Sequence, residues 1–388
     1  MKNQENAPQP DYLEDLNSDH RGSGIEVELG IEAPAEIREP FDPEKIDVKT
    51  KPMTVDLIMA RVREGDGEID LMPDFQRRAG IWDETRKSRL IESLLLRIPL
   101  PVFYVAADQN DRWSVVDGLQ RITTLKEFIH DEVLALQGLE FLHDLKGKRF
   151  SDLSRQMQRR IQETEITVHI IQPGTPSAVM FNIFKRINTG GLPLSAQEIR
   201  HAIKQGPSTR LLKQLADSRP FKEATRGSIN DERMADRECV LRFCAFYLTS
   251  PQQYTSGDLD AFLLQTMDRI NFASSTEIED LSQAFDRAMN RAKAILGKFA
   301  FRKYYGIQFR LSPINKALFE SWSIHLANLS TEEATALEAN KDGLLLQFAD
   351  LMTNYRFIDS ISTSTGTSAN VKLRFNTIGE LIQGALHA

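Results

Sequence analysis

Residues 113–125 read Trp-Ser-Val-Val-Asp-Gly-Leu-Gln-Arg-Ile-Thr-Thr-Leu, and this run constrains the fold more strongly than any other part of the chain. Its first half is β-branched and aromatic, which favours a half-buried strand. Asp117-Gly118 follows and favours a tight turn, because glycine tolerates positive φ. From Thr123 onwards, apolar residues recur at helical spacing. The run therefore predicts a strand, a glycine turn and a helix, in that order.

A helix that starts after a glycine turn offers backbone N–H groups and the positive end of its dipole to an anion. Arg121 adds a planar guanidinium that suits phosphate. Thr123 and Thr124 add hydroxyls for phosphate oxygens or metal-bound water. The alternative is a capped helix in which Arg121 forms a structural salt bridge, and this stretch alone leaves both interpretations open.

Length and composition are those of a globular protein. The 388 residues leave room for two or three domains, with 27% charged and 41% hydrophobic residues. No run of 18 apolar residues exists, so we expect no membrane span. Cys239 and Cys244 match neither a zinc site nor a disulfide framework and are predicted to lie in the core. These features, with no visible secretory signal, favour a cytoplasmic protein.

Charge is concentrated at the N-terminus. Residues 1–50 carry 13 acidic and 5 basic residues, whereas the remainder of the chain is almost neutral. We expect residues 1–48 to be an acidic, largely disordered tail, with a short strand at 25–29 as an option. The near-neutral body argues against a dedicated duplex-DNA binder but is compatible with a local basic cleft.

Residues 49–208 alternate between strand and helix patterns and are predicted to form a small α/β domain. The expected helices cover 54–63, with Leu57, Ile58 and Val62 inward, a stretch after an Asp83 cap, and 176–187. The expected strands cover 102–105, 113–116 and 167–171. Ser195 and Glu198 form a capping-box pattern for a further helix.

Residues 209–388 read as a helical domain. Apolar residues at helical spacing predict helices over 233–248, 257–270, 278–296, 313–326, 331–351 and 378–386. Residues 362–368 are predicted to be an exposed loop. Five scattered bases could line a cleft, although we expect a solvated surface for each: Arg302, Lys303, Arg310, Lys372 and Arg374.

Several short motifs occur in a fixed order. They are Pro-Asp-Phe-Gln-Arg at 73–77, Leu-Ile-Glu-Ser at 90–93, Ile-Pro-Leu-Pro at 98–101, the run at 117–125, and Arg-Ile-Asn-Thr-Gly-Gly at 186–191. This set resembles the N-terminal domain of GmrSD-type restriction endonucleases, part of the wider ParB and sulfiredoxin-like superfamily. The family signature is Asp-Gly-Gln-Gln-Arg, and Leu119 departs from it at the third position. The resemblance implies an α+β fold: a small ParB-like α/β domain followed by an all-helical domain.

The resemblance also implies a nucleotide pocket for an NTP of unknown base, with Mg²⁺. Asp117 would coordinate Mg²⁺ or orient water, and Arg121 would bind phosphate. Gln120 would orient water and would complete the catalytic set. The expected nucleotide-binding residues are Gln76, Arg77, Gly118, Thr123, Thr124, Arg186 and Asn188.

The seven histidines show no metal-ligand or nuclease spacing, so intrinsic nuclease activity is not expected. A sulfiredoxin-like activity would need a cysteine in the glycine-turn motif, where Leu119 and Gln120 stand. Two hypotheses remain. The first is a nucleotide-binding, NTP-hydrolysing sensor or regulatory subunit of a prokaryotic restriction or anti-phage system. The second is a non-catalytic ParB-like module that binds DNA or nucleotide and recruits a separate nuclease subunit.

Overall fold

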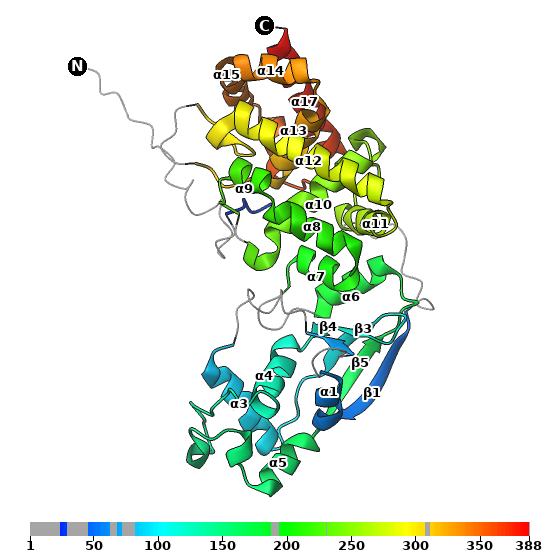
Figure 1. Ribbon diagram of the computed structural model, residues 1–388, viewed down its shortest axis with the longest axis vertical. Coiled ribbons are helices and arrows are strands. Elements are labelled where there is room, and N and C mark those ends of the chain that lie inside the picture. The colour runs from blue at the N-terminus through cyan, green and yellow to red at the C-terminus, as the bar shows by residue number, and fades with distance from the viewer. Residues whose placement is uncertain are drawn as a thin grey trace, which may run out of the picture. The chain divides into compact units, whose positions relative to one another are not determined.

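The computed structural model describes residues 24–28, 46–62, 68–71, 82–187, 194–229, 231–306 and 311–387 (Figure 1). The chain forms two compact units, and each is described by itself. One unit contains the described residues from 46 to 203, and it includes the five named strands. The other unit contains residues 24–28 and the described residues from 204 onwards, and its named elements are helices. This arrangement confirms the α+β class.

The first unit is built on a mixed five-stranded sheet with the spatial order β1-β5-β3-β4-β2. The strands are β1 Val48–Thr54, β2 Ile69–Asp70, β3 Phe103–Ala107, β4 Trp113–Asp117 and β5 Glu165–Ile171. β3 pairs with β5 in parallel and with β4 antiparallel, while β1 is antiparallel to β5 and β2 is parallel to β4. The expected strands at 102–105, 113–116 and 167–171 are thus all present, with bounds shifted by one or two residues.

Among its described residues, this unit has six α-helices beside the sheet: α1 Val55–Arg61, α3 Glu84–Leu95, α4 Leu119–Ile129, α5 Arg155–Gln162, α6 Ser177–Ile187 and α7 Ala196–Ile203. Asp83 caps α3 as predicted, because its carboxylate accepts a hydrogen bond from the Arg86 amide at 2.7 Å. The expectation for Leu57 is wrong, since this residue is 47% exposed. Ile58 and Val62 are buried as predicted, and Val55 and Met59 are buried with them.

The helical unit contains ten α-helices among its described residues: α8 Pro207–Asp217, α9 Arg219–Thr225, α10 Ala235–Leu248, α11 Leu259–Asn271, α12 Ser275–Leu296, α13 Lys316–Asn328, α14 Thr331–Ala339, α15 Lys341–Leu351, α16 Tyr355–Ser362 and α17 Ser368–Leu386. α10 and α13 pack against each other and are buried on nearly every face. Cys239 and Cys244 lie in this core, as predicted. None of the helices in the described part of the chain could cross a membrane.

Several expectations for this unit are wrong. The predicted helix over 331–351 is two helices, because the chain breaks at Asn340, whose side-chain Nδ2 donates to the Ala385 carbonyl at 2.9 Å. The predicted loop at 362–368 is present between α16 and α17, but it is not exposed throughout, since Thr365 is fully buried. Three of the scattered bases are buried rather than solvated: Arg302, Lys303 and Arg374.

Candidate functional site

The predicted strand, glycine turn and helix are all present: they are β4, Gly118 and α4. Gly118 has φ 103°, and a Cβ added there would lie 2.4 Å from the Phe103 ring, so glycine is required by both conformation and space. A register shift between β3 and β4 precedes the turn: Tyr104 pairs with Asp117, while Val105 pairs with Val115. The extra residue makes this a β-bulge, a feature that is frequent beside active sites. The N-cap residue of α4 is Gly118 itself, which has no side chain that could cap the helix.

Arg121 is buried in the first turn of α4. Its guanidinium donates to the carbonyl oxygens of Pro101 and Val102, the latter at 3.2 Å, and to the Asp117 carboxylate at 2.8 Å. The same guanidinium lies 4.2 Å from the centre of the Phe103 ring. Burial lowers the pKa of Arg121, and the neighbouring Asp117 partly offsets this effect.

These contacts connect the start of β3 to the end of β4 through one side chain. They favour the structural salt bridge, which the sequence left open as the alternative to phosphate binding. Arg121 therefore positions Asp117 and Phe103 in the described structure. Its role as a phosphate ligand remains a prediction.

The other polar residues of the motif also have partners within the domain. Gln120 accepts a hydrogen bond from the Trp82 amide at 3.3 Å, which fixes the entry to α3. The hydroxyls of Thr123 and Thr124 donate to the carbonyls one turn earlier in α4, at 2.9 and 2.7 Å. Thr124 is completely buried, so in this arrangement its hydroxyl is out of reach of a ligand.

Two helices pack against β4, the strand that ends at Asp117. They are α6, whose last turn carries the exposed Arg186, and α7. The predicted capping box starts α7, with Ser195 Oγ accepting from the Glu198 amide at 3.1 Å and the Glu198 carboxylate accepting from the Ser195 amide. Gln76, Arg77 and Asn188 lie outside the described residues.

Sequence reasoning missed the role of Glu92, which lies in the Leu-Ile-Glu-Ser motif. Its buried carboxylate accepts hydrogen bonds from the amides of Glu140, Phe141 and Leu142, at 2.9, 2.8 and 2.8 Å. Burial alone would raise the pKa of Glu92, but the three donors hold it below its ordinary value. The sequence did contain a signal for this role, because Glu92 stands among the buried apolar residues of α3, where a carboxylate needs hydrogen-bond donors.

The turn could hold Mg²⁺ only together with a nucleotide, because its described residues offer a single carboxylate, that of Asp117. No three histidine, cysteine, aspartate or glutamate side chains in the described ranges gather into a metal site. Mg²⁺ bound to a nucleotide, however, often uses one or two carboxylates and takes its other ligands from phosphates and water. Asp117 supplies one carboxylate, whose side chain is 33% exposed and whose Oδ2 is bound by Arg121.

One comparison with known proteins gave a match. The family model described as "GmrSD restriction endonuclease, N-terminal domain" matches residues 59–203, which run from within α1 to the end of α7. No curated protein and no solved structure matches the chain. The family match confirms, over residues 59–203, the resemblance indicated by the sequence motifs.

Proposed function

We propose that the domain over residues 59–203 binds a nucleoside triphosphate and acts as a sensor or regulatory part of a prokaryotic restriction or anti-phage system. The observation that carries this proposal is the turn at Gly118. A left-handed glycine is the N-cap residue of α4 and offers no capping side chain, directly beside the carboxylate of Asp117. Uncapped helix N-termini after glycine turns are favourable positions for phosphate.

The proposed roles follow from position. The first amides of α4 face the phosphates, with Gly118 leaving space at the turn. Asp117 and Gln120 orient water or bind Mg²⁺, which would neutralise phosphate charge when bound. Arg121 is a positioning residue that holds Asp117 in place. Gln76, Arg77, Arg186 and Asn188 are the proposed phosphate-binding side chains, and Thr123 a further hydroxyl at the first turn.

Calorimetric titration of the full chain with each of the four NTPs, with and without Mg²⁺, tests nucleotide binding. Arg186→Ala is expected to weaken binding by roughly ten- to a hundredfold, the loss of one charge-assisted hydrogen bond. Lys185→Ala is the matched control, because Lys185 is the neighbouring exposed cation in the same turn of α6. Absence of binding for all four NTPs would refute the proposal.

Release of inorganic phosphate distinguishes the hydrolysing sensor from the second candidate, a non-catalytic ParB-like module that recruits a nuclease and binds DNA or nucleotide. One observation favours the second candidate: Arg121 already engages the carboxylate of the motif. Mg²⁺-dependent turnover that is lost in Asp117→Asn would support hydrolysis. Nucleotide binding without turnover would support the recruiting module.

A further inference from the structure

Residues 24–28 are bound by the helical unit as an extended peptide. The Glu26 amide donates to the Ile314 carbonyl at 2.8 Å, and the Ile314 amide donates to the Gly24 carbonyl at 3.0 Å. These two bonds form an isolated parallel bridge between Ile25 and Ile314. Main-chain pairing of this kind is one of the recurrent ways in which proteins bind extended peptides.

Each inward residue of the segment has a specific site. Gly24 has φ 74° and lies so close to the Ser228 carbonyl that a Cβ would fall 1.8 Å from its oxygen. The Ile25 side chain is buried in the hydrophobic core of the unit. The Glu26 carboxylate accepts from Lys303 at 2.6 Å and from Asn315 at 3.1 Å. Val27, between the two acidic residues, is exposed.

Glu28 has the most extensive contacts. Its carboxylate accepts two hydrogen bonds from Arg242, at 2.9 and 2.6 Å, and one from the Thr365 hydroxyl at 2.7 Å. Lys316 lies 3.9 Å away. Burial alone would raise the pKa of Glu28, but Arg242 and Lys316 hold it below its ordinary value. Bidentate pairing of arginine with carboxylate is geometrically specific as well as strong.

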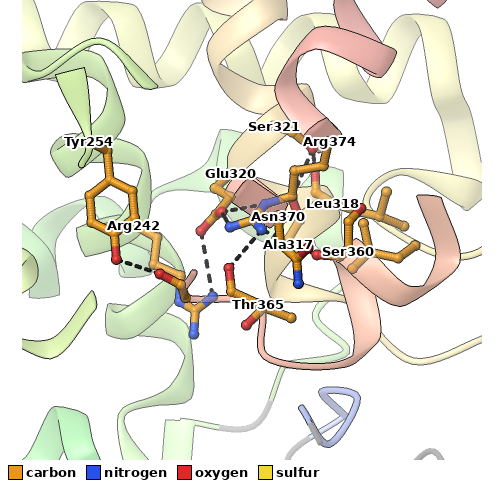
Figure 2. Close-up of polar contacts among 12 residues, drawn as sticks. Arg242, Tyr254, Ala317, Leu318, Glu320, Ser321, Ser360, Thr365, Asn370 and Arg374 are labelled. Atoms are coloured by element: carbon orange, nitrogen blue, oxygen red, sulfur yellow. Dashed lines mark hydrogen bonds and ion pairs between the residues drawn. The ribbon is translucent and has the colours of Figure 1, made fainter. Parts of the chain in front are cut away.

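Among the described residues that the ion pairs of this site connect, the charges balance only when the segment is bound. Glu320 lies between Arg242 and Arg374 (Figure 2), and Glu238 contacts both Arg242 and Lys316. With Lys303, this described network has four cations against two glutamates of its own, and Glu26 and Glu28 supply the missing two negative charges. Buried charges left without partners are strongly destabilising, so the site requires two carboxylates.

We propose that the helical unit carries a recognition site for an extended acidic peptide of the pattern Gly-Ile-Glu-x-Glu, and that the chain fills this site with its own residues 24–28. The segment is distant in sequence from every residue that binds it, and the sheet unit intervenes between them along the chain. It therefore reaches the site as a separate piece, as a peptide ligand would. A peptide of this pattern from a partner protein would compete for the same cations.

The test starts from the full chain with a protease site inserted between Pro34 and Ala35. After cleavage, the N-terminal fragment is expected to remain with the rest of the protein on gel filtration. A fluorescent peptide with the sequence of residues 20–32 is then added and its anisotropy followed. The peptide is expected to replace the fragment and to bind the cleaved protein at least tenfold more tightly than the uncleaved protein, in which the tethered segment competes.

The matched control is the same peptide with Glu26→Gln and Glu28→Gln. It should bind at least about a hundredfold more weakly, because each lost charge pair costs about tenfold or more. These changes are made in the peptide, so they leave the folding of the protein untouched. Equal binding of both peptides would overturn the recognition by charge. Three other results would overturn the binding site itself. The first is a fragment that never exchanges with the peptide, and the second is a protein that unfolds when the fragment is released. The third is a fragment that dissociates and leaves a folded protein that does not bind the peptide.

Discussion

Arg121 illustrates how one residue can satisfy a family motif and still be part of the scaffold. A phosphate ligand at a helix N-terminus would need donors directed towards the ligand, whereas this guanidinium donates to two carbonyls and a carboxylate of its own domain. The carbonyls of Pro101 and Val102 are invisible to a sequence motif, because they are contributed by the backbone of a distant segment. The family motif singled out Arg121, and its contacts show that it holds Asp117 and the start of β3 together.

Arg121→Ala is expected to lower the free energy of unfolding by about 2–3 kcal/mol, because two carbonyls and the Asp117 carboxylate lose their donor. Urea unfolding of the full chain measures the change. Arg112→Ala, which removes an exposed arginine from the same unit, should stay within about 0.5 kcal/mol of the wild type. If Arg121→Ala instead kept its normal stability and lost its nucleotide affinity, Arg121 would be a phosphate ligand.

The requirement for glycine at position 118 has two components that can be separated. Gly118→Ala should destabilise the protein through both positive φ and contact with the Phe103 ring. Gly147→Ala isolates the first component, since Gly147 has φ 79° and open space around its Cβ position. The conformational component costs about 1–2 kcal/mol, and Gly118→Ala should exceed it clearly in thermal or urea unfolding. Equal losses at both positions would contradict the steric explanation.

At the scale of elements, local patterns predicted most of the structure. The strand at 113–117, the Asp83 cap and the Ser195–Glu198 capping box follow from alternation, helical spacing and cap chemistry, which act over a few residues. The break at Asn340, whose side-chain amide donates to the distant Ala385 carbonyl, was missed because a contact of this kind leaves no local pattern in the sequence. The burial of Arg374 was missed for the same reason, since its partner is Glu320.

Glu92 anchors the segment 140–142 to α3, and its lowered pKa predicts a pH dependence. A carboxyl whose pKa is lowered by folding stabilises the native state above its unfolded pKa, about 4.3. That stabilisation is lost as pH falls through the lowered pKa of the folded state. The difference in unfolding free energy between wild type and Glu92→Gln should therefore be largest near neutral pH and shrink below about pH 4.

Urea unfolding over a pH series measures this difference. Glu163→Gln is the control, because Glu163 is an exposed glutamate of the same unit. Its difference from the wild type should be small over the whole series. A difference for Glu92→Gln that does not vary with pH would mean that its three amide contacts do not depend on the charge of the carboxylate.

At the scale of the whole molecule, the chain enters the helical unit first, forms the sheet unit, and then completes the helical unit. Composition predicted an acidic tail, but no local pattern indicated that Glu26 and Glu28 complete a buried network of cations. The family match covers the sheet unit from within α1 onwards, and the candidate nucleotide site is proposed within that unit. If the proposal is right, a bound nucleotide acts first on residues of the sheet unit, among them the first turn of α4.

Hydrogen–deuterium exchange of the full chain, with and without a saturating NTP and Mg²⁺, tests the central claim most directly. The amides of residues 118–121 at the uncapped start of α4 should exchange more slowly when phosphate binds them, and the last turn of α6 around Arg186 should follow. Residues 235–248, in the core helix α10 of the other unit, should be unchanged and serve as the internal control. The claim that phosphate binds at the start of α4 would be contradicted if a nucleotide bound and slowed exchange elsewhere in the chain but left residues 118–121 unaffected.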